Sequence, residues 1–376
     1  MNIAIDALEV NLNNKVGMGN YADNLIRSLA LIDSKNDYTF YVNNLVDKDN
    51  QIKKNNFKYR KLASPTIRSF WSQCRIPLEL IKNKPDLLHV PTGHKIPFNS
   101  PQHTVVTIHD LAFNKFPEYF EKSVRLRSQY FTRHAVLKAE KIIAISESTK
   151  KDIIEHYNID AEKIEVIYHG VEPVFKSGID KQRTEDVCSK YGINSLFVLF
   201  VGVLQPRKNI SQLVSAFKQV LKSGHENMQL VIAGGKGWMY DQIFNDAKLS
   251  GISEKIVFTD YTSKQDVICL LNAAKVFVLP SLYEGFGLPI LEAMACGTPV
   301  IASNVSSMQE IVQDAGILID PYNQQEITQA ILDILNNQNL ADELTTKGLK
   351  LAESFTWEKT AKKTLDLYLS MLKNRK

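Results

Sequence analysis

The fold of this chain is decided by the stretch PSLYEGFGLPILEAMACGTPVIA, residues 280–302. The apolar run before it, residues 275–279, is short and rich in β-branched and aromatic residues, which predicts a buried strand. Gly285 and Gly287 favour a tight turn, and the following proline suits the start of a helix, where its missing N–H costs nothing. Gly297 is expected to end that helix before a further strand. The stretch therefore predicts strand, turn, helix and strand in an α/β fold.

The same stretch places two carboxylates around a turn that suits an anion. A helix start after a strand and a glycine turn presents free backbone N–H groups and a positive helix end. Glu284 precedes the turn and Glu292 lies inside the predicted helix. Carboxylates are unfavourable beside a phosphate, but they fit if they accept hydrogen bonds from the hydroxyls of a ribose or a hexose. The alternative is an ordinary glycine loop with one capping and one solvated glutamate.

The run E-G-F-G-L-P-I-L-E-A-M-A-C-G-T-P-V-I-A-S resembles the E-x7-E signature of glycosyltransferase family 4, with Glu284 and Glu292 as the two glutamates. The resemblance is close over nearly the whole second half and loose over the first half. It implies a GT-B architecture: two Rossmann-like doubly wound α/β domains facing a central cleft. It also implies retaining transfer of a hexose from a nucleotide sugar to a saccharide or lipid-linked acceptor in polysaccharide synthesis, without a metal or other cofactor. The donor-binding residues implied at this loop are Gly285, Phe286, Gly287, Leu288 and Glu292, with Glu284 as a catalytic residue holding hexose hydroxyls.

Two adjacent cations, Arg207 and Lys208, follow the strand predicted at residues 196–201. Two cations and free N–H groups can hold two phosphates without a metal. The alternative is an exposed basic turn. G-x-L-x-P-R-K-N resembles the family 4 pattern for the diphosphate. Some members carry an arginine directly after the glycine, where this chain has Val203, so Arg207 must supply that contact or the diphosphate is held less tightly.

The first half carries a second glycine turn and a histidine at a strand end. Gly19 lies where a helix opens after the strand predicted at residues 2–6, which again suits an anion, although the pattern is not a full G-x-G-x-x-G. His109 and Asp110 end the strand predicted at residues 104–108, and ligands of open sheets bind beyond such ends. A purely structural histidine is the alternative. The resemblance implies that the Gly19 loop lies near the donor phosphates and His109, as a catalytic residue, lies beside the hexose and β-phosphate. Asp110 then orients that imidazole or faces the acceptor.

Irregular sequence at residues 169–193 marks a domain boundary. We expect an acceptor-binding domain at residues 1–178 and a nucleotide-sugar-binding domain at residues 179–356. In GT-B proteins the last helix crosses back, so residues 357–376 are expected to pack on the first domain.

Composition indicates an ordinary soluble protein: 376 residues, 44% hydrophobic and 23% charged, with a net charge of +4. Residues 51–150 hold about 18 Lys and Arg against about 7 Asp and Glu, a local excess of about +11. Such an excess could meet nucleic acid, an anionic lipid or an anionic substrate. The basic, aromatic-containing helix predicted at residues 123–139 can lie on an anionic membrane surface, or it can be an ordinary amphipathic helix. The alternative is a solvated face. The chain has no signal-peptide pattern and no apolar run of about 20 residues. Four scattered cysteines suggest no disulfide framework, so we expect a cytoplasmic protein, peripheral on the inner face of the cell membrane if the contact exists.

Other functions stay open at this point. A sugar-nucleotide epimerase would need a general base for a sugar carbon, for which no motif is visible, and a non-catalytic nucleotide-sugar-binding protein would be expected to lack the site residues. UDP-glucose and GDP-mannose both fit as donors, and no nucleic-acid partner is expected. Asp47 and Asp49 form a D-x-D that could hold manganese, but their polar segment is typical of a surface loop.

Overall fold

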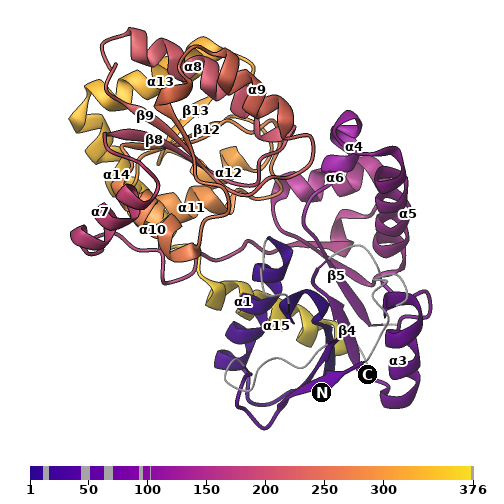
Figure 1. The fold of residues 1–376 in the computed structure, drawn as a ribbon. Coiled ribbons are helices and arrows are strands. Elements are labelled where there is room, and N and C mark those ends of the chain that lie inside the picture. The colour runs from indigo at the N-terminus through magenta and orange to yellow at the C-terminus, as the bar shows by residue number, and fades with distance from the viewer. Residues whose placement is uncertain (12–16, 44–50, 63–70, 93–95, 102, 374–376) are drawn as a thin grey trace. The chain divides into compact units, whose positions relative to one another are not determined.

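A computed structural model describes residues 1–11, 17–43, 51–62, 71–92, 96–101 and 103–373. The chain divides into two compact units (Figure 1). The first is Met1–Gly170 together with Thr356–Lys376, and the second is Val171–Phe355. Residues 171–178, expected in the first domain, therefore belong to the second unit.

The first unit contains a parallel sheet in the order β3-β2-β1-β4-β5-β6-β7. Its strands are β1 Asn2–Asp6, β2 Asp37–Val42, β3 Phe57–Lys61, β4 Leu87–Val90, β5 Thr104–Ile108, β6 Lys141–Ala144 and β7 Ile164–Val166. The strand order reverses between β1 and β4, where Ile3 pairs with Leu87. Strand β3 is an edge strand of which only Phe57 is buried. It was not predicted, because a strand exposed along most of its length lacks an apolar run.

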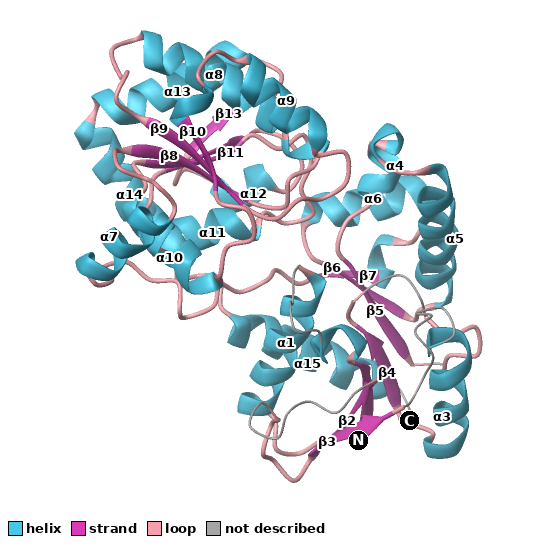
Figure 2. Cartoon of the chain, viewed as in Figure 1, coloured by secondary structure: helices cyan, strands magenta, loops and turns pink. Residues whose placement is uncertain are grey.

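Helices cover both faces of this sheet (Figure 2). They are α1 Met18–Ile32, α3 Ile76–Asn83, α4 Ala112–Lys115, α5 Lys122–Lys138, α6 Glu147–Tyr157 and α15 Trp357–Lys373. Helices α1 and α15 pack against each other and bury Tyr21, Leu25 and Tyr368 on one face. Helices α3, α5 and α6 supply the core of the other face. Ser146 caps α6 by accepting a hydrogen bond from the Thr149 N–H at 3.0 Å.

The second unit repeats this architecture with a parallel sheet in the order β10-β9-β8-β11-β12-β13. Its strands are β8 Phe197–Val201, β9 Gln229–Ala233, β10 Ile256–Phe258, β11 Val276–Leu279, β12 Val300–Ser303 and β13 Ile317–Ile319. The order reverses between β8 and β11, where Val198 pairs with Val276.

Eight helices of the second unit lie within the described residues: α7 Lys181–Lys190, α8 Ile210–Lys222, α9 Asp241–Leu249, α10 Lys264–Ala273, α11 Leu288–Ala295, α12 Met308–Val312, α13 Gln324–Asn336 and α14 Gln338–Ala352. Helix α8 contacts α9 and α13, whereas α11 contacts α10 and α14, and Figure 2 shows these groups on opposite faces of the sheet. Short turns of 3-10 type lie at Leu8–Asn11, Pro117–Tyr119, Ala161–Lys163, Pro206–Lys208 and Ser253–Lys255, and one of π type at Trp71–Arg75. The prediction of two Rossmann-like α/β domains is confirmed.

The stretch at residues 280–302 has the predicted order of elements. Strand β11 precedes it, α11 lies within it, and β12 begins at Val300. Gly287 has φ of 93° and Gly297 has φ of 77°, so both occupy the left-handed region that favours glycine. Gly285 does not have positive φ, so a single glycine makes the turn.

Candidate functional site

The two predicted cations lie at the carboxyl end of β8. Arg207 and Lys208 belong to the 3-10 turn Pro206–Lys208, which leads into α8. Their side chains are only 12% and 8% exposed, so the alternative of an exposed basic turn is wrong. Because the strand order reverses between β8 and β11, the cations occupy the edge of the sheet where open α/β folds bind ligands.

Glu284, which follows β11, pairs with both cations. Its Oε1 lies 2.5 Å from Lys208 Nζ and its Oε2 lies 3.2 Å from Arg207 Nη1. Burial alone would raise the pKa of this carboxyl, but the charges of Lys208 and then Arg207 outweigh burial and lower the pKa to about 2. Glu284 is therefore ionised at neutral pH. A carboxylate offers about four lone-pair positions, so two ion pairs leave room for hydroxyl donors.

The loop after Glu284 is fixed by side-chain hydrogen bonds from a neighbouring segment. The Glu284 N–H donates to Ser306 Oγ at 2.9 Å, and Ser307 Oγ donates to the Glu284 carbonyl at 2.9 Å. Phe286 is buried, with its ring 6.2 Å from that of Phe355. Its ring therefore anchors the loop, and a ligand would meet this loop mainly through its backbone.

The helix that carries Glu292 begins directly after this loop. Gly287 is the N-cap residue of α11, and Leu288 is half-buried in its first turn. Glu292 is also half-buried. Burial, followed by the charge of Glu172, raises the pKa of Glu292 to about 7, although Lys264 acts in the opposite direction. The two glutamates of the motif therefore differ: Glu284 is firmly ionised, whereas Glu292 exchanges its proton near neutral pH.

In the first unit, the predicted glycine turn opens α1. Gly17 is the N-cap residue with φ of 45°, and Gly19 is buried in the first turn of the helix. The loop before it, residues 12–16, lies outside the described residues. Gly19 therefore lies at a helix start after β1, as expected, and its contact with phosphate stays a prediction.

His109 lies directly after β5, as predicted, and is 8% exposed. Its Nε2 lies 2.7 Å from the Pro91 carbonyl oxygen. Burial lowers the pKa of His109, although the Pro91 hydrogen bond and the Asp110 charge oppose that effect. The Asp110 carboxylate accepts a hydrogen bond from the Ala112 N–H at 3.0 Å. The imidazole is thus oriented through Pro91, and Asp110 contributes its charge and a backbone hydrogen bond.

Aromatic residues that were not predicted as site residues surround His109. Tyr21, from α1, has its ring 4.9 Å from that of His109, and His169 lies 5.9 Å from it. Trp357, the first residue of α15, lies 5.6 Å from His169. These residues come from segments far apart in the sequence, so local pattern could not group them. A weak signal was the position of Tyr21, one turn into the helix opened by the glycine loop.

The described residues contain no group of three or more His, Cys, Asp or Glu suited to hold a metal ion. Asp47 and Asp49 lie outside the described residues, so the structure does not test their D-x-D. Within the described ranges, no helix has the length and apolar character needed to cross a bilayer.

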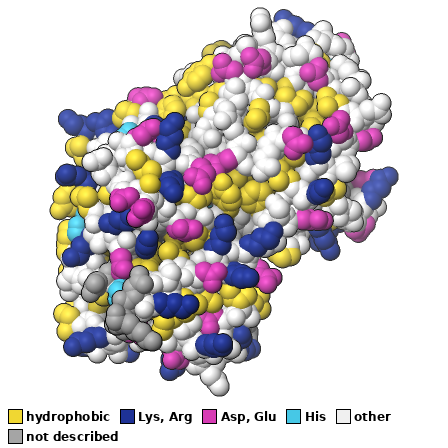
Figure 3. Space-filling view, turned by 180° about the vertical axis from the view of Figure 1, so that it is seen from behind, with side chains coloured by type: hydrophobic (Ala, Val, Ile, Leu, Met, Phe, Trp, Pro, Cys, Tyr) yellow, Lys and Arg dark blue, Asp and Glu magenta, His cyan; other side chains and the backbone are white. Residues whose placement is uncertain are grey.

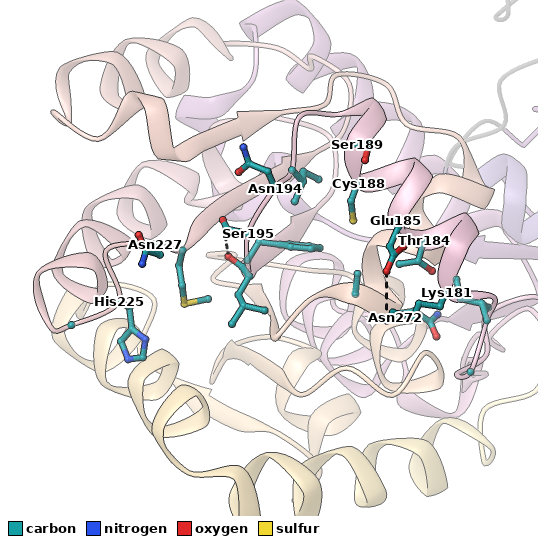
Figure 4. Close-up of a pocket in the computed structure, with 18 residues that line it drawn as sticks. Lys181, Thr184, Glu185, Cys188, Ser189, Asn194, Ser195, His225, Asn227 and Asn272 are labelled. Carbon is teal, nitrogen blue, oxygen red and sulfur yellow. Dashed lines mark hydrogen bonds and ion pairs between the residues drawn. The ribbon is translucent and has the colours of Figure 1, made fainter.

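A hollow of about 1030 Å³ lies elsewhere in the second unit (Figure 4). It is bordered by α7, by Asn194 and Ser195 before β8, by Asn227 before β9, and by Asn272 near the end of α10. These positions are at the amino ends of the strands. The hollow is therefore separate from Arg207, Lys208 and Glu284, which lie at the carboxyl ends.

Comparison with protein families matches both halves of the chain. Residues 17–175 match the model described as Glycosyltransferase Family 4, and residues 188–351 match Glycosyl transferases group 1. O-antigen chain mannosyltransferase B of Escherichia coli is 33% identical over 71% of this chain and 70% of its own length. The serotype-specific mannosyltransferase WbdA of Escherichia coli is 28% identical over 82% of this chain but only 39% of its own length.

Solved structures share the fold. Sucrose-phosphate synthase from Thermosynechococcus elongatus has a TM-score of 0.77 and 21% identity, and the match covers 99% of each chain. Anabaena HepE in complex with UDP-glucose has a TM-score of 0.76 and 17% identity, covering 98% of this chain and all of that one. At this level of identity the likeness supports the two-domain GT-B fold.

Proposed function

Because this chain belongs to the family 4 glycosyltransferases, we propose that it transfers a hexose from a nucleoside-diphosphate sugar to a saccharide or lipid-linked acceptor, with retention at the anomeric carbon. The observation that carries this proposal is the cluster of Arg207, Lys208 and Glu284 at the point where the strand order reverses. In this cluster, two buried cations can bind a diphosphate, and the adjacent carboxylate can accept hydrogen bonds from sugar hydroxyls. A diphosphate needs no metal where two protein cations neutralise it, so we propose a metal-independent reaction.

The cations act on the charge that develops during transfer. The bond between C1 of the hexose and the diphosphate oxygen breaks while the acceptor oxygen bonds to C1 on the same face. The acceptor's proton passes to the departing phosphate, so the products are the lengthened acceptor and a nucleoside diphosphate. Arg207 and Lys208 stabilise the negative charge that accumulates on the leaving group, because they are held in place before the reaction begins.

Three further residues have separate roles in this proposal. Glu284 accepts hydrogen bonds from hexose hydroxyls through the lone pairs that the cations leave unused. Glu292 accepts from the ribose. His109 is uncharged near pH 7, since burial lowers its pKa, which favours a hydrogen bond with a sugar hydroxyl over an ion pair with phosphate.

For the transferred sugar, we propose mannose before glucose. Two of the related sequences are described as O-antigen or serotype-specific mannosyltransferases. We therefore expect GDP-mannose to be the donor and a growing polysaccharide to be the acceptor. HepE was solved with UDP-glucose, which makes this sugar nucleotide the comparison donor.

The test begins with binding and ends with stereochemistry. Thermal unfolding is measured with GDP, UDP, GDP-mannose and UDP-glucose, and a ligand at about one hundred times its Kd should stabilise the protein by about 2.7 kcal/mol. The stabilising donor is then incubated with oligosaccharide acceptors, and the new linkage is examined by NMR. An α-linked product from an α-linked donor supports retention. An inverted linkage, or an epimerised donor without transfer, would overturn the proposal.

We also propose that the exposed face of α5 contacts an anionic membrane. Leu126, Tyr130 and Leu137 are 51%, 60% and 53% exposed, and they alternate with exposed Arg127, Arg133 and Lys138. Exposed apolar and basic side chains on one helix suit a lipid–water interface. In contrast, Val136 is buried and Arg125 is half-buried. In the alternative, these basic side chains only keep the protein soluble. On the face seen in Figure 3, basic side chains are interspersed with acidic ones, as this alternative expects.

Vesicle co-sedimentation separates these accounts. The protein should sediment with anionic vesicles and not with neutral ones, and high salt should release it. Arg127→Glu combined with Arg133→Glu should weaken sedimentation, whereas reversal of two lysines of the second unit, Lys218→Glu and Lys222→Glu, should not. Equal failure to sediment with both vesicle types would contradict membrane contact.

A further inference from the structure

Four buried aromatic rings form a cluster at His109 within the first unit. Tyr21 is edge-on to His109, with centroids 4.9 Å apart and planes at 85°. On its other sides the Tyr21 ring meets His169 at 4.7 Å and Trp357 at 5.9 Å. Exposure of these residues is 1% for Tyr21, 8% for His109, 8% for His169 and 5% for Trp357. Tyr21 and His169 therefore each contact the other three rings, and Tyr21 is the one whose ring centroid lies nearer to that of His109, at 4.9 Å against 5.9 Å.

The hydroxyl of Tyr21 is also held in place. It lies 3.2 Å from Thr107 Oγ1, which lies 2.9 Å from His89 Nε2. His89 Nδ1 in turn shares a hydrogen bond of 2.5 Å with the Tyr368 hydroxyl of α15. This chain of hydrogen bonds crosses from α1 through β5 and β4 to α15, so the Tyr21 ring has little freedom to rotate.

The backbone around the cluster is packed too closely to shift. A Cβ on Gly170 would lie 2.0 Å from the Trp357 N atom, so no other residue fits there without movement. Thr360 Oγ1 donates to the Tyr168 carbonyl at 2.7 Å. The segment carrying His169 and the start of α15 are thereby fixed to each other, and His169 and Trp357 both contact the Tyr21 ring.

The hydrogen bond of His109 identifies its tautomer. A proline carbonyl only accepts, so Nε2 must carry the proton that it donates to Pro91. The ring is neutral, since burial lowers its pKa, and Nδ1 then carries a lone pair. The ionisable groups around the ring are Asp110, His89, His169 and Tyr21. Burial keeps His89 and His169 neutral as well, so Asp110 supplies the one negative charge among them.

We propose that Tyr21 is a positioning residue for sugar transfer: its ring holds the His109 imidazole in the orientation that donates from Nε2 to Pro91 and presents Nδ1 as an acceptor for a substrate hydroxyl. Without the ring, the imidazole gains space to rotate about its side-chain bonds and to exchange tautomers. Small losses of orientation at a reacting group reduce rates by up to about a hundredfold. This inference rests on the proposed function of His109, so its first readout is independent of activity.

The first readout is the ¹⁵N NMR spectrum of histidine-labelled protein, with the His109 signals identified by their loss in His109→Gln. Wild type should show one tautomer, protonated at Nε2, and a His109 pKa below the ordinary value for histidine. Tyr21→Leu should show averaged tautomers and a higher His109 pKa, whereas Tyr21→Phe, which keeps the ring, should resemble wild type. Phe40→Leu is the matched control, because Phe40 is a fully buried ring of the same core whose observed ring partners are Phe57 and Tyr59.

The second readout is turnover, measured with the donor and acceptor that the thermal-unfolding and transfer assays identify. Tyr21→Leu should lower kcat about tenfold to a hundredfold and leave KM for the donor nearly unchanged. The fall of kcat towards acidic pH should begin at a higher pH than in wild type. Tyr21→Phe should retain most of the turnover. If Tyr21→Leu lowers Tm as Phe40→Leu does but leaves the His109 tautomer and the pH profile unchanged, the positioning role is wrong. If the NMR spectrum changes and turnover does not, Tyr21 still orients His109 but His109 does not serve transfer.

Discussion

Replacing Glu284 by glutamine tests the central cluster most directly. The substitution keeps the size of the side chain and removes its charge, so Lys208 and Arg207 lose their shared counterion while staying buried. An uncompensated buried cation is costly, and breaking a buried pair by removing one partner typically destabilises by about 3–5 kcal/mol.

The pKa of Glu284 gives an independent value for how much the ionised carboxylate stabilises the folded protein. A pKa lowered from 4.5 to about 2 corresponds to roughly 3 kcal/mol of stabilisation by the ionised form, at about 1.36 kcal/mol per pKa unit. Because the folded-state pKa is lowered, this stability is fully present above pH 4.5 and is lost as the pH falls from 4.5 towards 2. Glu284→Gln should therefore be less stable than wild type by about 3 kcal/mol at pH 7, and the difference should shrink below pH 4.5.

Urea unfolding at pH 7 and at intervals below pH 4.5 measures this difference. Glu343→Gln is the matched control, since Glu343 pairs with Lys347 on an exposed helix surface and such pairs contribute at most about 1 kcal/mol. Nucleoside diphosphate supplies a replacement anion, so it should raise the Tm of Glu284→Gln more than that of wild type. Equal stability of Glu284→Gln and wild type at pH 7, or a difference independent of pH, would refute the ion-pair reasoning.

Three further predictions concern the nucleotide, pH and metal. Glu292→Ala should weaken nucleoside diphosphate binding about tenfold to a hundredfold above pH 7, where Glu292 is ionised, because a hydrogen bond with a charged acceptor contributes about 1.5–3 kcal/mol; unchanged affinity in calorimetry would contradict the ribose assignment. The pKa of Glu292 is raised to about 7, so ionisation costs the folded state stability as the pH rises from 4.5 through 7; Glu292→Gln should therefore gain stability over wild type between pH 5 and pH 8 in urea unfolding. Turnover should survive EDTA, whereas its loss and rescue by manganese would point back to Asp47 and Asp49.

The sequence by itself determined the elements that depend on local signals. Apolar β-branched runs indicated β8 and β11, and proline and glycine indicated the ends of α11, because burial of a parallel strand and helix termination act through neighbouring residues. The long match around Glu284 and Glu292 identified the family. Edge strand β3 escaped prediction, since a mostly exposed strand carries little apolar pattern.

Only the tertiary structure decided how the site residues are charged and oriented. Glu284 and Lys208 are 76 residues apart, and their pairing follows from the reversal of strand order between β8 and β11. The raised pKa of Glu292 requires burial and the nearby Glu172, and the tautomer of His109 requires the Pro91 carbonyl. The ring of Tyr21 reaches His109 because α1 and β5 belong to one packed unit. Charge and orientation depend on the distances between side chains and on the loss of water around them, and packing of segments distant in the chain sets both.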